Sequence, residues 1–265
     1  MLQLTNIRGY MEQFAPLVLA EEWDNVGLLA GDPESTVERV MTCLTVTPRS
    51  AEEAVQGDAD LIITHHPLPF RGIKCMATTT TTGRLLWQLI SHEIAIYSPH
   101  TAFDSAARGI NQQLAEGLQL SDIAPLIQTD ALPEGAGTGR IGSLATSVPL
   151  RHLAKRLQAF LGVEQLEFVG NLDAPVQRIA VACGAAGELL PAARQASCEV
   201  LVLGEAKFHT CLEAEANDVA LLLPGHFASE RFAVARLAKT LSSEFPELDV
   251  WASASESDPI GHFRG

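Results

Sequence analysis

The sequence is poor in features that mark several large classes of protein. Five of its 265 residues are cysteine, and none of them forms a CxxC pair. An odd number without paired spacing argues against a disulfide framework. The same lack of paired cysteines makes a structural metal the least favoured kind of metal site, since structural zinc in cytosolic proteins is usually held by closely spaced cysteines. Cys43 and Cys183 lie in apolar runs and are predicted to be small buried side chains.

Basic residues are scarce as well. The chain has 18 Lys and Arg against 32 Asp and Glu, a formal net charge of −14, and no basic run. Nonspecific binding to nucleic acid needs Lys and Arg clustered on one face. We therefore expect no nucleic-acid partner.

Long hydrophobic runs are missing too. No stretch approaches the roughly 20 apolar residues that a membrane-spanning helix needs. Arg8, Glu12 and Pro16 interrupt the apolar character of the N-terminal segment, so no signal peptide is expected either. These absences predict a cytoplasmic protein without a membrane partner. The hydrophobic content of 47% still suffices for one large domain or two small ones.

The order of apolar runs predicts an α/β fold. Strand-like runs at 37–46, 59–67 and 93–104 alternate with helical segments at 50–55 and 83–93. Strands that alternate with helices in this way are typical of a largely parallel or mixed sheet.

The second half of the chain repeats this order. Gly31 lies eight residues before Arg39, and Gly170 lies eight before Arg178. The segments HTAFD (100–104) and HFASE (226–230) correspond in the same way. Such self-similarity predicts two similar, duplicated lobes. We place them at 1–128 and 129–265, with a C-terminal segment able to pack back on the first lobe.

Each half places a histidine at the end of a strand and a carboxylate four residues later. The pairs are His100 with Asp104, and His226 with Glu230. If a helix begins at each histidine, positions i and i+4 share one face of it. The same spacing allows HExxH helices to bind zinc. Two matched pairs in a repeat therefore indicate a metal site.

The dipeptide His65-His66 supplies further ligands. Pro67 favours an extended conformation for His66, so the strand continues to its end. Adjacent strand residues point to opposite sides, and we expect the two imidazoles to serve two ions rather than one. Two-metal hydrolytic sites hold their ions roughly 3.5–4 Å apart. The prediction is a pair of divalent ions bound by His65, His66, Asp104, His226 and Glu230.

Several residues keep alternative interpretations at this stage. His100 is either a hydrogen-bonded structural residue or a proton shuttle or orienting residue at the site. Trp23 is interpreted as a packing anchor in preference to a ring that stacks on substrate. The turn at 183–187 is either a plain tight turn or an anion site. Contact of Glu205 and His209 with the site is left open.

Six segments together resemble a known family, the GTP cyclohydrolase type 2 homologues, also called Ngg-interacting-factor-like proteins. The resemblance covers nearly the whole chain and rests on 22–32, 59–74, 96–106, 178–190, 199–209 and 225–230. It implies two similar α/β lobes with a binuclear metal site between them, held by the same five ligands. It also implies a homohexamer built from dimers.

The function expected from these features is that of a metal-dependent hydrolase acting on a nucleotide-like or heterocyclic small molecule. Zinc, iron or manganese would suit the ligands. One ion would be held mainly by His65 and His226 and the other by His66 and Asp104, with Glu230 bridging them and His100 as the candidate catalytic residue. The alternative is a non-catalytic metal-binding protein with a regulatory or interaction role, for which a saturated coordination shell would be diagnostic.

Overall fold

The computed structural model describes residues 2–128, 133–261 and 263. The chain divides into two compact units, of which the first comprises residues 1–103 and 233–265 and the second residues 104–232. The lobe boundary expected at 128/129 falls inside the second unit, beside residues 129–132, which lie outside the described residues. Each unit contains its own sheet and its own hydrophobic core.

The sheet of the first unit has five strands in the order β13-β4-β5-β6-β2. Four of them are parallel, and β2 runs antiparallel to β6. Strand β13 comes from the C-terminal part of the chain and pairs with β4, extending the sheet at that edge. The bounds are β2 (Gly27–Ala30), β4 (Arg39–Thr45), β5 (Leu61–His66), β6 (Ala95–Ser98) and β13 (Asp249–Ala252).

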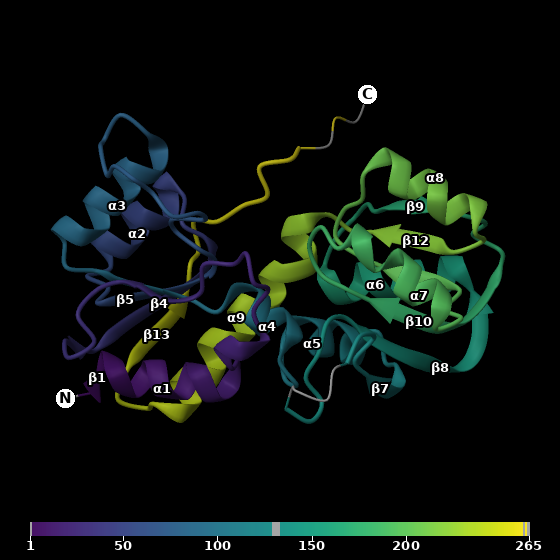
Figure 1. The fold of residues 1–265 in the computed structure, drawn as a ribbon, viewed down its shortest axis with the longest axis horizontal. Helices are drawn as coiled ribbons and strands as arrows, with labels where there is room; N and C mark the ends of the chain where they lie inside the picture. Colours follow the sequence, from purple (N-terminus) through teal and green to yellow (C-terminus); the bar gives the residue numbers. More distant parts are fainter. Residues whose placement is uncertain (1, 129–132, 262, 264–265) are drawn as a thin grey trace. The chain divides into compact units, whose positions relative to one another are not determined.

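Helices cover both faces of this sheet (Figure 1). Helices α2 (Pro48–Gln56) and α3 (Thr81–Ser91) pack on one face, against alternate strand residues such as Met41 and Ile62. Helix α1 (Leu4–Phe14) and the later part of α9 (His226–Glu244) lie on the other face. There Thr42 Oγ1 donates a hydrogen bond to the carbonyl of Val234. A short helix, η1 (Leu17–Leu19), and a small antiparallel pair, β1 (Leu2–Gln3) with β3 (Thr36–Val37), complete the unit.

The second unit has a six-stranded sheet in the order β7-β8-β10-β11-β12-β9. Its three central strands, β10, β11 and β12, are parallel, whereas β7, β8 and β9 run antiparallel to their neighbours. The expected mixed α/β fold is thus confirmed, with parallel and antiparallel strands in both sheets. The bounds are β7 (Ser121–Ala124), β8 (Arg140–Pro149), β9 (Glu167–Val169), β10 (Pro175–Val181), β11 (Val200–Val202) and β12 (Ala220–Leu223).

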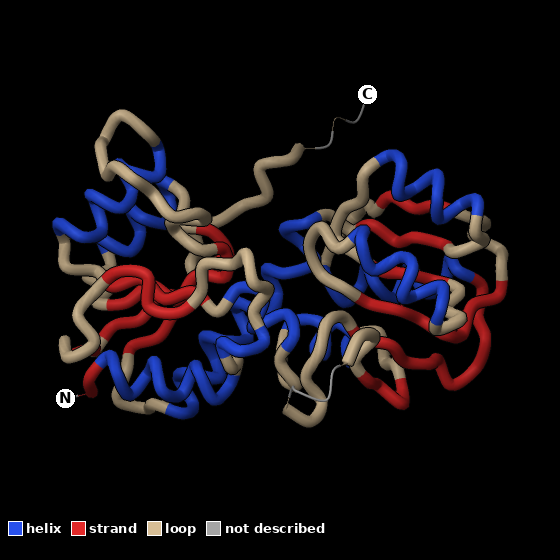
Figure 2. Tube along the Cα trace, in the orientation of Figure 1, coloured by secondary structure: helices blue, strands red, loops and turns tan. Residues whose placement is uncertain are grey.

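Period-two alternation distributes the residues of this sheet between two cores. Ile179 and Val181 face α5 (Ile110–Gly117) and α6 (Leu150–Leu161). The intervening Ala180 faces α7 (Leu190–Gln195) and α8 (Phe208–Ala216), beside the short helix η2 (Gly187–Leu189). Figure 2 shows the strands of this sheet enclosed by these helices.

Two strand-to-helix junctions carry the predicted metal-binding pairs. Strand β6 ends at Ser98 and α4 (His100–Ser105) begins two residues later. Strand β12 ends at Leu223, and α9 begins at His226. Strand β6 is shorter than the predicted run 93–104, and both β6 and β12 end where a proline follows directly. Both histidines therefore start helices, as the i, i+4 argument required. Among the described residues, no helix combines the length and the apolar character needed to cross a bilayer.

Candidate metal centre

Three imidazoles converge at the end of β5 and the start of α4, in the first unit. His65, His66 and His100 each offer a ring nitrogen, and these three atoms lie within 4.8 Å of one another. The ring centroids are 5.0 Å apart for His65 and His66, 5.1 Å for His65 and His100, and 5.5 Å for His66 and His100. We call these residues the histidine cluster. They could hold a metal ion.

Neighbouring strands fix the members of the histidine cluster in place. The hydroxyl of Ser98 on β6 donates to the carbonyl of His65 at 2.7 Å. Thr45 on β4 hydrogen-bonds Nδ1 of His66 through its hydroxyl at 2.7 Å. His65 is buried, whereas His66 is half-buried. The sheet thus holds the backbone of His65 and the ring of His66 before any ligand arrives.

The two adjacent imidazoles lie close together, although pleating points neighbouring strand side chains to opposite sides. His66 is the last residue of β5, so its side chain is no longer confined by a continuing strand. Its bond to Thr45 turns the ring toward the cluster. The rings of His65 and His66 are therefore close enough to act on one ligand or on two neighbouring ones.

His100 is held by Asp24, a residue that precedes it by 76 positions. Its Nδ1 lies 2.7 Å from Oδ1 of Asp24, whose side chain is fully buried. The other carboxylate oxygen accepts from the backbone N–H and the hydroxyl of Thr101. Burial alone would raise the pKa of Asp24, but the hydrogen bonds from His100 and Thr101 outweigh it, so the pKa lies below its usual value. The carboxylate is ionised and anchors Nδ1, leaving Nε2 of His100 for a proton or an ion.

His100 also has an uncommon backbone conformation. Its φ of +25° lies outside the regions that non-glycine residues usually occupy. Such outliers persist only where surrounding contacts determine them, and they concentrate at functional sites. The contacts of Asp24 with His100 and Thr101 are of that kind.

In the second unit, α9 presents an imidazole between two carboxylates. Nε2 of His226 lies 3.2 Å from Oε2 of Glu230, one helical turn along, and Nδ1 lies 3.1 Å from Oε1 of Glu205. The hydrogen bond to Glu230 is the largest influence, and together with Glu205 it overcomes the opposing effect of burial and raises the pKa of His226 to about 9. We call these three residues the His226 cluster. Glu205 thus contacts the predicted ligand, while His209 is exposed on α8.

Asp104 lies in the second unit beside a thiol that the sequence did not single out for function. Sγ of Cys183 donates to Oδ1 of Asp104 at 3.0 Å. Burial and then the nearby charges of Asp104 and Glu230 raise the pKa of Cys183 well above its usual value. The thiol therefore remains protonated and orients the carboxylate. Cys183 and Cys43 are both buried, as predicted.

The turn after β10 is fitted closely around Glu230. The amide of Gly184 donates to Oγ of Ser229 at 3.0 Å, and its carbonyl accepts from the amide of Glu205. This amide already has a partner and is therefore not available to an anion. A side chain at position 184 would meet Oε1 of Glu230 at 2.4 Å. Only glycine leaves room for the carboxylate.

The raised pKa of His226 predicts a pH-dependent metal affinity. Between pH 7 and pH 9 His226 in the metal-free protein is mostly protonated, so an ion that binds there has to displace a proton. We expect zinc affinity to rise by up to about tenfold per pH unit over this interval and then to level off. Chelator competition at pH 7, 8 and 9 measures it. Glu205→Gln should flatten the dependence, and an affinity equal at all three pH values would exclude His226 as a ligand.

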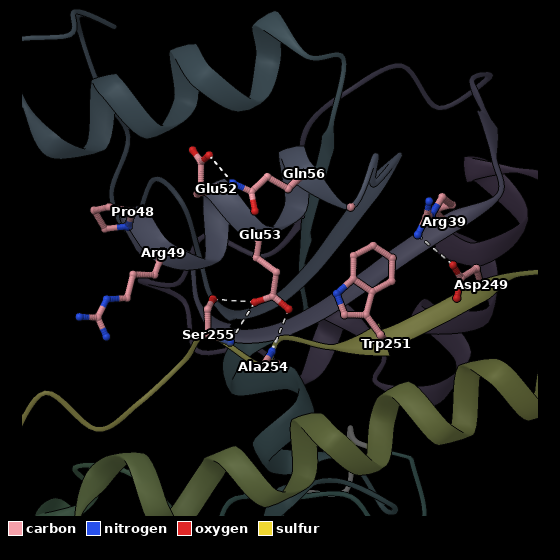
Figure 3. A pocket seen from close by; sticks show the side chains of 11 residues that line it. Arg39, Pro48, Arg49, Glu52, Glu53, Gln56, Asp249, Trp251, Ala254 and Ser255 are labelled. Atoms are coloured by element: carbon pink, nitrogen blue, oxygen red, sulfur yellow. Dashed lines mark hydrogen bonds and ion pairs between the residues drawn. The ribbon is translucent and has the colours of Figure 1, made fainter.

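A separate pocket of about 1010 Å³ lies in the first unit between α2 and β13 (Figure 3). Trp251 forms part of its wall, and Arg39 lies over this ring and pairs with Asp249. Glu53 accepts hydrogen bonds from Ser253, Ala254 and Ser255, which lowers its pKa to about 2 despite partial burial. The ionised Glu53 carboxylate therefore binds the segment 253–255 to α2. Glu53, Arg39 and Asp249 are thus engaged in structural contacts.

Known proteins resemble this chain over nearly its whole length. The GTP cyclohydrolase 1 type 2 homolog of Streptomyces coelicolor is 32% identical over 267 residues, which cover 98% of this chain and 94% of that protein. The protein NIF3 homolog of Schizosaccharomyces pombe is 29% identical, over 91% of each chain.

Solved structures share the fold. Staphylococcus aureus protein SA1388 superposes with a TM-score of 0.88 at 24% identity, covering 99% of each chain. Reduced HcgD from Methanocaldococcus jannaschii gives a TM-score of 0.82 at 23% identity, covering 95% of this chain and 97% of that one. The family model described as DUF34/NIF3 (NGG1p interacting factor 3) matches residues 2–259. The chain therefore belongs to the DUF34/NIF3 family, which confirms the resemblance seen in its motifs.

Proposed function

We propose that the protein is a metal-dependent hydrolase with a binuclear centre, acting on a nucleotide-like or heterocyclic small molecule. The observation that carries the proposal is the convergence of the three ring nitrogens of His65, His66 and His100 within 4.8 Å. Three imidazoles in one place are the ligand chemistry of zinc, iron or manganese. The names of relatives as GTP cyclohydrolase homologues support a heterocyclic substrate.

The proposed centre also draws on carboxylates. The histidine cluster offers neutral ligands alone, whereas Asp104 and Glu230 add the negative charge that two dications require. We propose that Asp104, His226 and Glu230 complete the centre, with Glu230 bridging the ions. A bound pair of divalent ions would supply Lewis acidity and lower the pKa of a bound water.

The chain's own residues would prepare this chemistry. Asp24 holds His100 through Nδ1, which leaves Nε2 for a proton or an ion. Cys183 donates to one oxygen of Asp104 and so orients its carboxylate. Glu205 orients His226 through Nδ1. Such a contact from outside the coordination shell fixes the ring orientation of a metal ligand and raises its basicity.

We further propose that the two units arose by duplication. Gly31 and Gly170 both have positive φ, and each lies close against the first alanine of the neighbouring strand, Ala95 or Ala220. A second match is a carboxylate directly before a strand that accepts two successive backbone N–H groups. Asp60 does so for Glu38 and Arg39, and Glu199 does so for Gln177 and Arg178. A homohexameric assembly, expected from the family resemblance, remains part of the proposal.

Metal stoichiometry tests the binuclear centre. Protein purified without chelator and saturated with zinc should bind two ions per chain by elemental analysis. His65→Ala should bind at most one, because it removes the most deeply buried imidazole of the histidine cluster. His152→Ala, an exposed residue on α6, is the matched control and should retain two. A wild-type chain that saturates at one ion would contradict the proposal.

Hydrolysis is tested separately on the same preparations. A panel of nucleotides and pterin-like compounds should yield a product in the presence of wild-type protein and His152→Ala but not of His65→Ala. Two bound ions without turnover of any compound would favour the non-catalytic metal-binding alternative.

A further inference from the structure

Two large aromatic side chains are exposed beside the histidine cluster. Trp23 is 60% exposed and Phe70 is 45% exposed. Their ring centroids are 6.0 Å apart, and each lies edge-to-face with the ring of His100, at 6.0 Å and 5.7 Å. By contrast, Phe103, which contacts His65, is 1% exposed. The aromatic surface at this place therefore faces solvent next to the candidate ligands.

Both rings are carried by loops that are fastened at their bases. Asp24, the residue after Trp23, is bonded to His100 and Thr101. Asn25 donates its side-chain N–H to the carbonyl of Pro69, directly before Phe70, at 2.8 Å. The two loops are thus connected to each other and to α4. This arrangement limits the freedom of the rings to fold onto the core.

Leaving such apolar surface in water is unfavourable. Exposed aromatic rings fixed beside polar catalytic groups are the usual means of binding planar ligands, because stacking tolerates many ring types. A separation of 6.0 Å with an interplanar angle of 32° leaves no room for a third ring between Trp23 and Phe70. A ligand would lie on their outer surface.

We propose that Trp23 and Phe70 form an aromatic wall on which the planar ring of a heterocyclic substrate stacks, with its polar edge toward the histidine cluster. The proposal rests on the proposed function and specifies its substrate as a free planar heterocycle. The net charge of −14 disfavours a nucleic-acid strand as the occupant. Trp23 is thereby assigned to binding, contrary to its interpretation as a packing anchor.

Binding by calorimetry to the full, zinc-loaded chain tests the wall. Guanosine, adenosine and neopterin are the probes, and ribose is the non-aromatic control. At least one aromatic probe should bind, and Trp23→Ala should weaken it at least tenfold. Phe70→Ala should weaken it too, while Trp23→Phe retains most of the affinity. Trp87→Ala is the matched control, since Trp87 is 55% exposed on α3.

Three results would overturn the aromatic wall. The first is that no aromatic probe binds, and the second is that wild type and Trp23→Ala bind with equal affinity. The third is a lower oligomer mass of Trp23→Ala by light scattering, because the wall would then be a contact between copies of the chain. Turnover, measured beside binding, separates this inference from the proposed function. Trp23-dependent binding without any turnover would refute the hydrolase and leave the wall intact. Turnover with a KM unchanged in Trp23→Ala would refute the aromatic wall and leave the hydrolase intact.

Discussion

Arg140→Met is expected to lower the free energy of unfolding by about 3–5 kcal/mol, because it leaves buried carbonyl groups without their donor. Arg140 is completely buried at the start of β8. One terminal nitrogen donates to the carbonyls of Gly137 and Gly139 at 2.7 Å, and the other donates to Ala106 at 2.6 Å. Its Nε donates to Gln112. Burial lowers the pKa of Arg140 to about 10, so the guanidinium remains charged at pH 7.

These contacts connect the residues that follow α4 to the loop before β8. Lysine cannot replace the planar fork of donors, so Arg140→Lys should recover only a small part of the loss. Urea unfolding measures both variants. The control is Arg151→Met, which removes an exposed ion pair with Asp173 and should cost no more than about 1 kcal/mol. If Arg140→Met is no less stable than Arg151→Met, the buried guanidinium is not a structural requirement.

The periodicity of the sequence predicted the local structure well. The strand-like runs at 37–46 and 59–67 became β4 and β5, and the helical segments at 50–55 and 83–93 became α2 and α3. These elements are encoded by contacts between near neighbours. The position of β13 beside β4 could not be read in this way, because the pairing joins residues about 210 positions apart, such as Asp249 and Arg39. Sequence spacing alone does not specify which strand edge a distant segment occupies.

The same distinction between local patterns and distant contacts applies to the candidate site. The i, i+4 pairs at His100 and His226 follow from helix geometry, and both helices begin where the argument placed them. Asp24 and Cys183 were missed as site residues because their partners, His100 and Asp104, lie 76 and 79 positions away. A hydrogen-bond partner so far away in the chain produces no recognisable spacing pattern in the sequence. The one signal available was the EWDN segment, which carried the family resemblance without a role for its aspartate.

Gly184→Ala is expected to weaken metal binding by about 10–100-fold while the fold survives. A β-carbon at this position would lie 2.4 Å from Oε1 of Glu230 and 3.5 Å from Cε1 of His226. The atom it meets is the far end of a flexible side chain, so the carboxylate rather than the backbone would move. A displaced Glu230 loses its contact with His226 and its proposed place between the ions. Zinc affinity and stoichiometry measure the effect.

Gly162→Ala provides the matched control, because the two glycines differ in surroundings and not in backbone. Gly184 has φ +62° and Gly162, at the end of α6, has φ +69°, whereas nothing lies within 4 Å of a β-carbon at position 162. Both substitutions should cost about 1–2 kcal/mol for an alanine in the left-handed region. The loss of metal affinity should occur in Gly184→Ala alone. Equal affinities in the two variants would mean that the position of the Glu230 carboxylate does not matter for metal binding, and Glu230 would have to be removed from the centre.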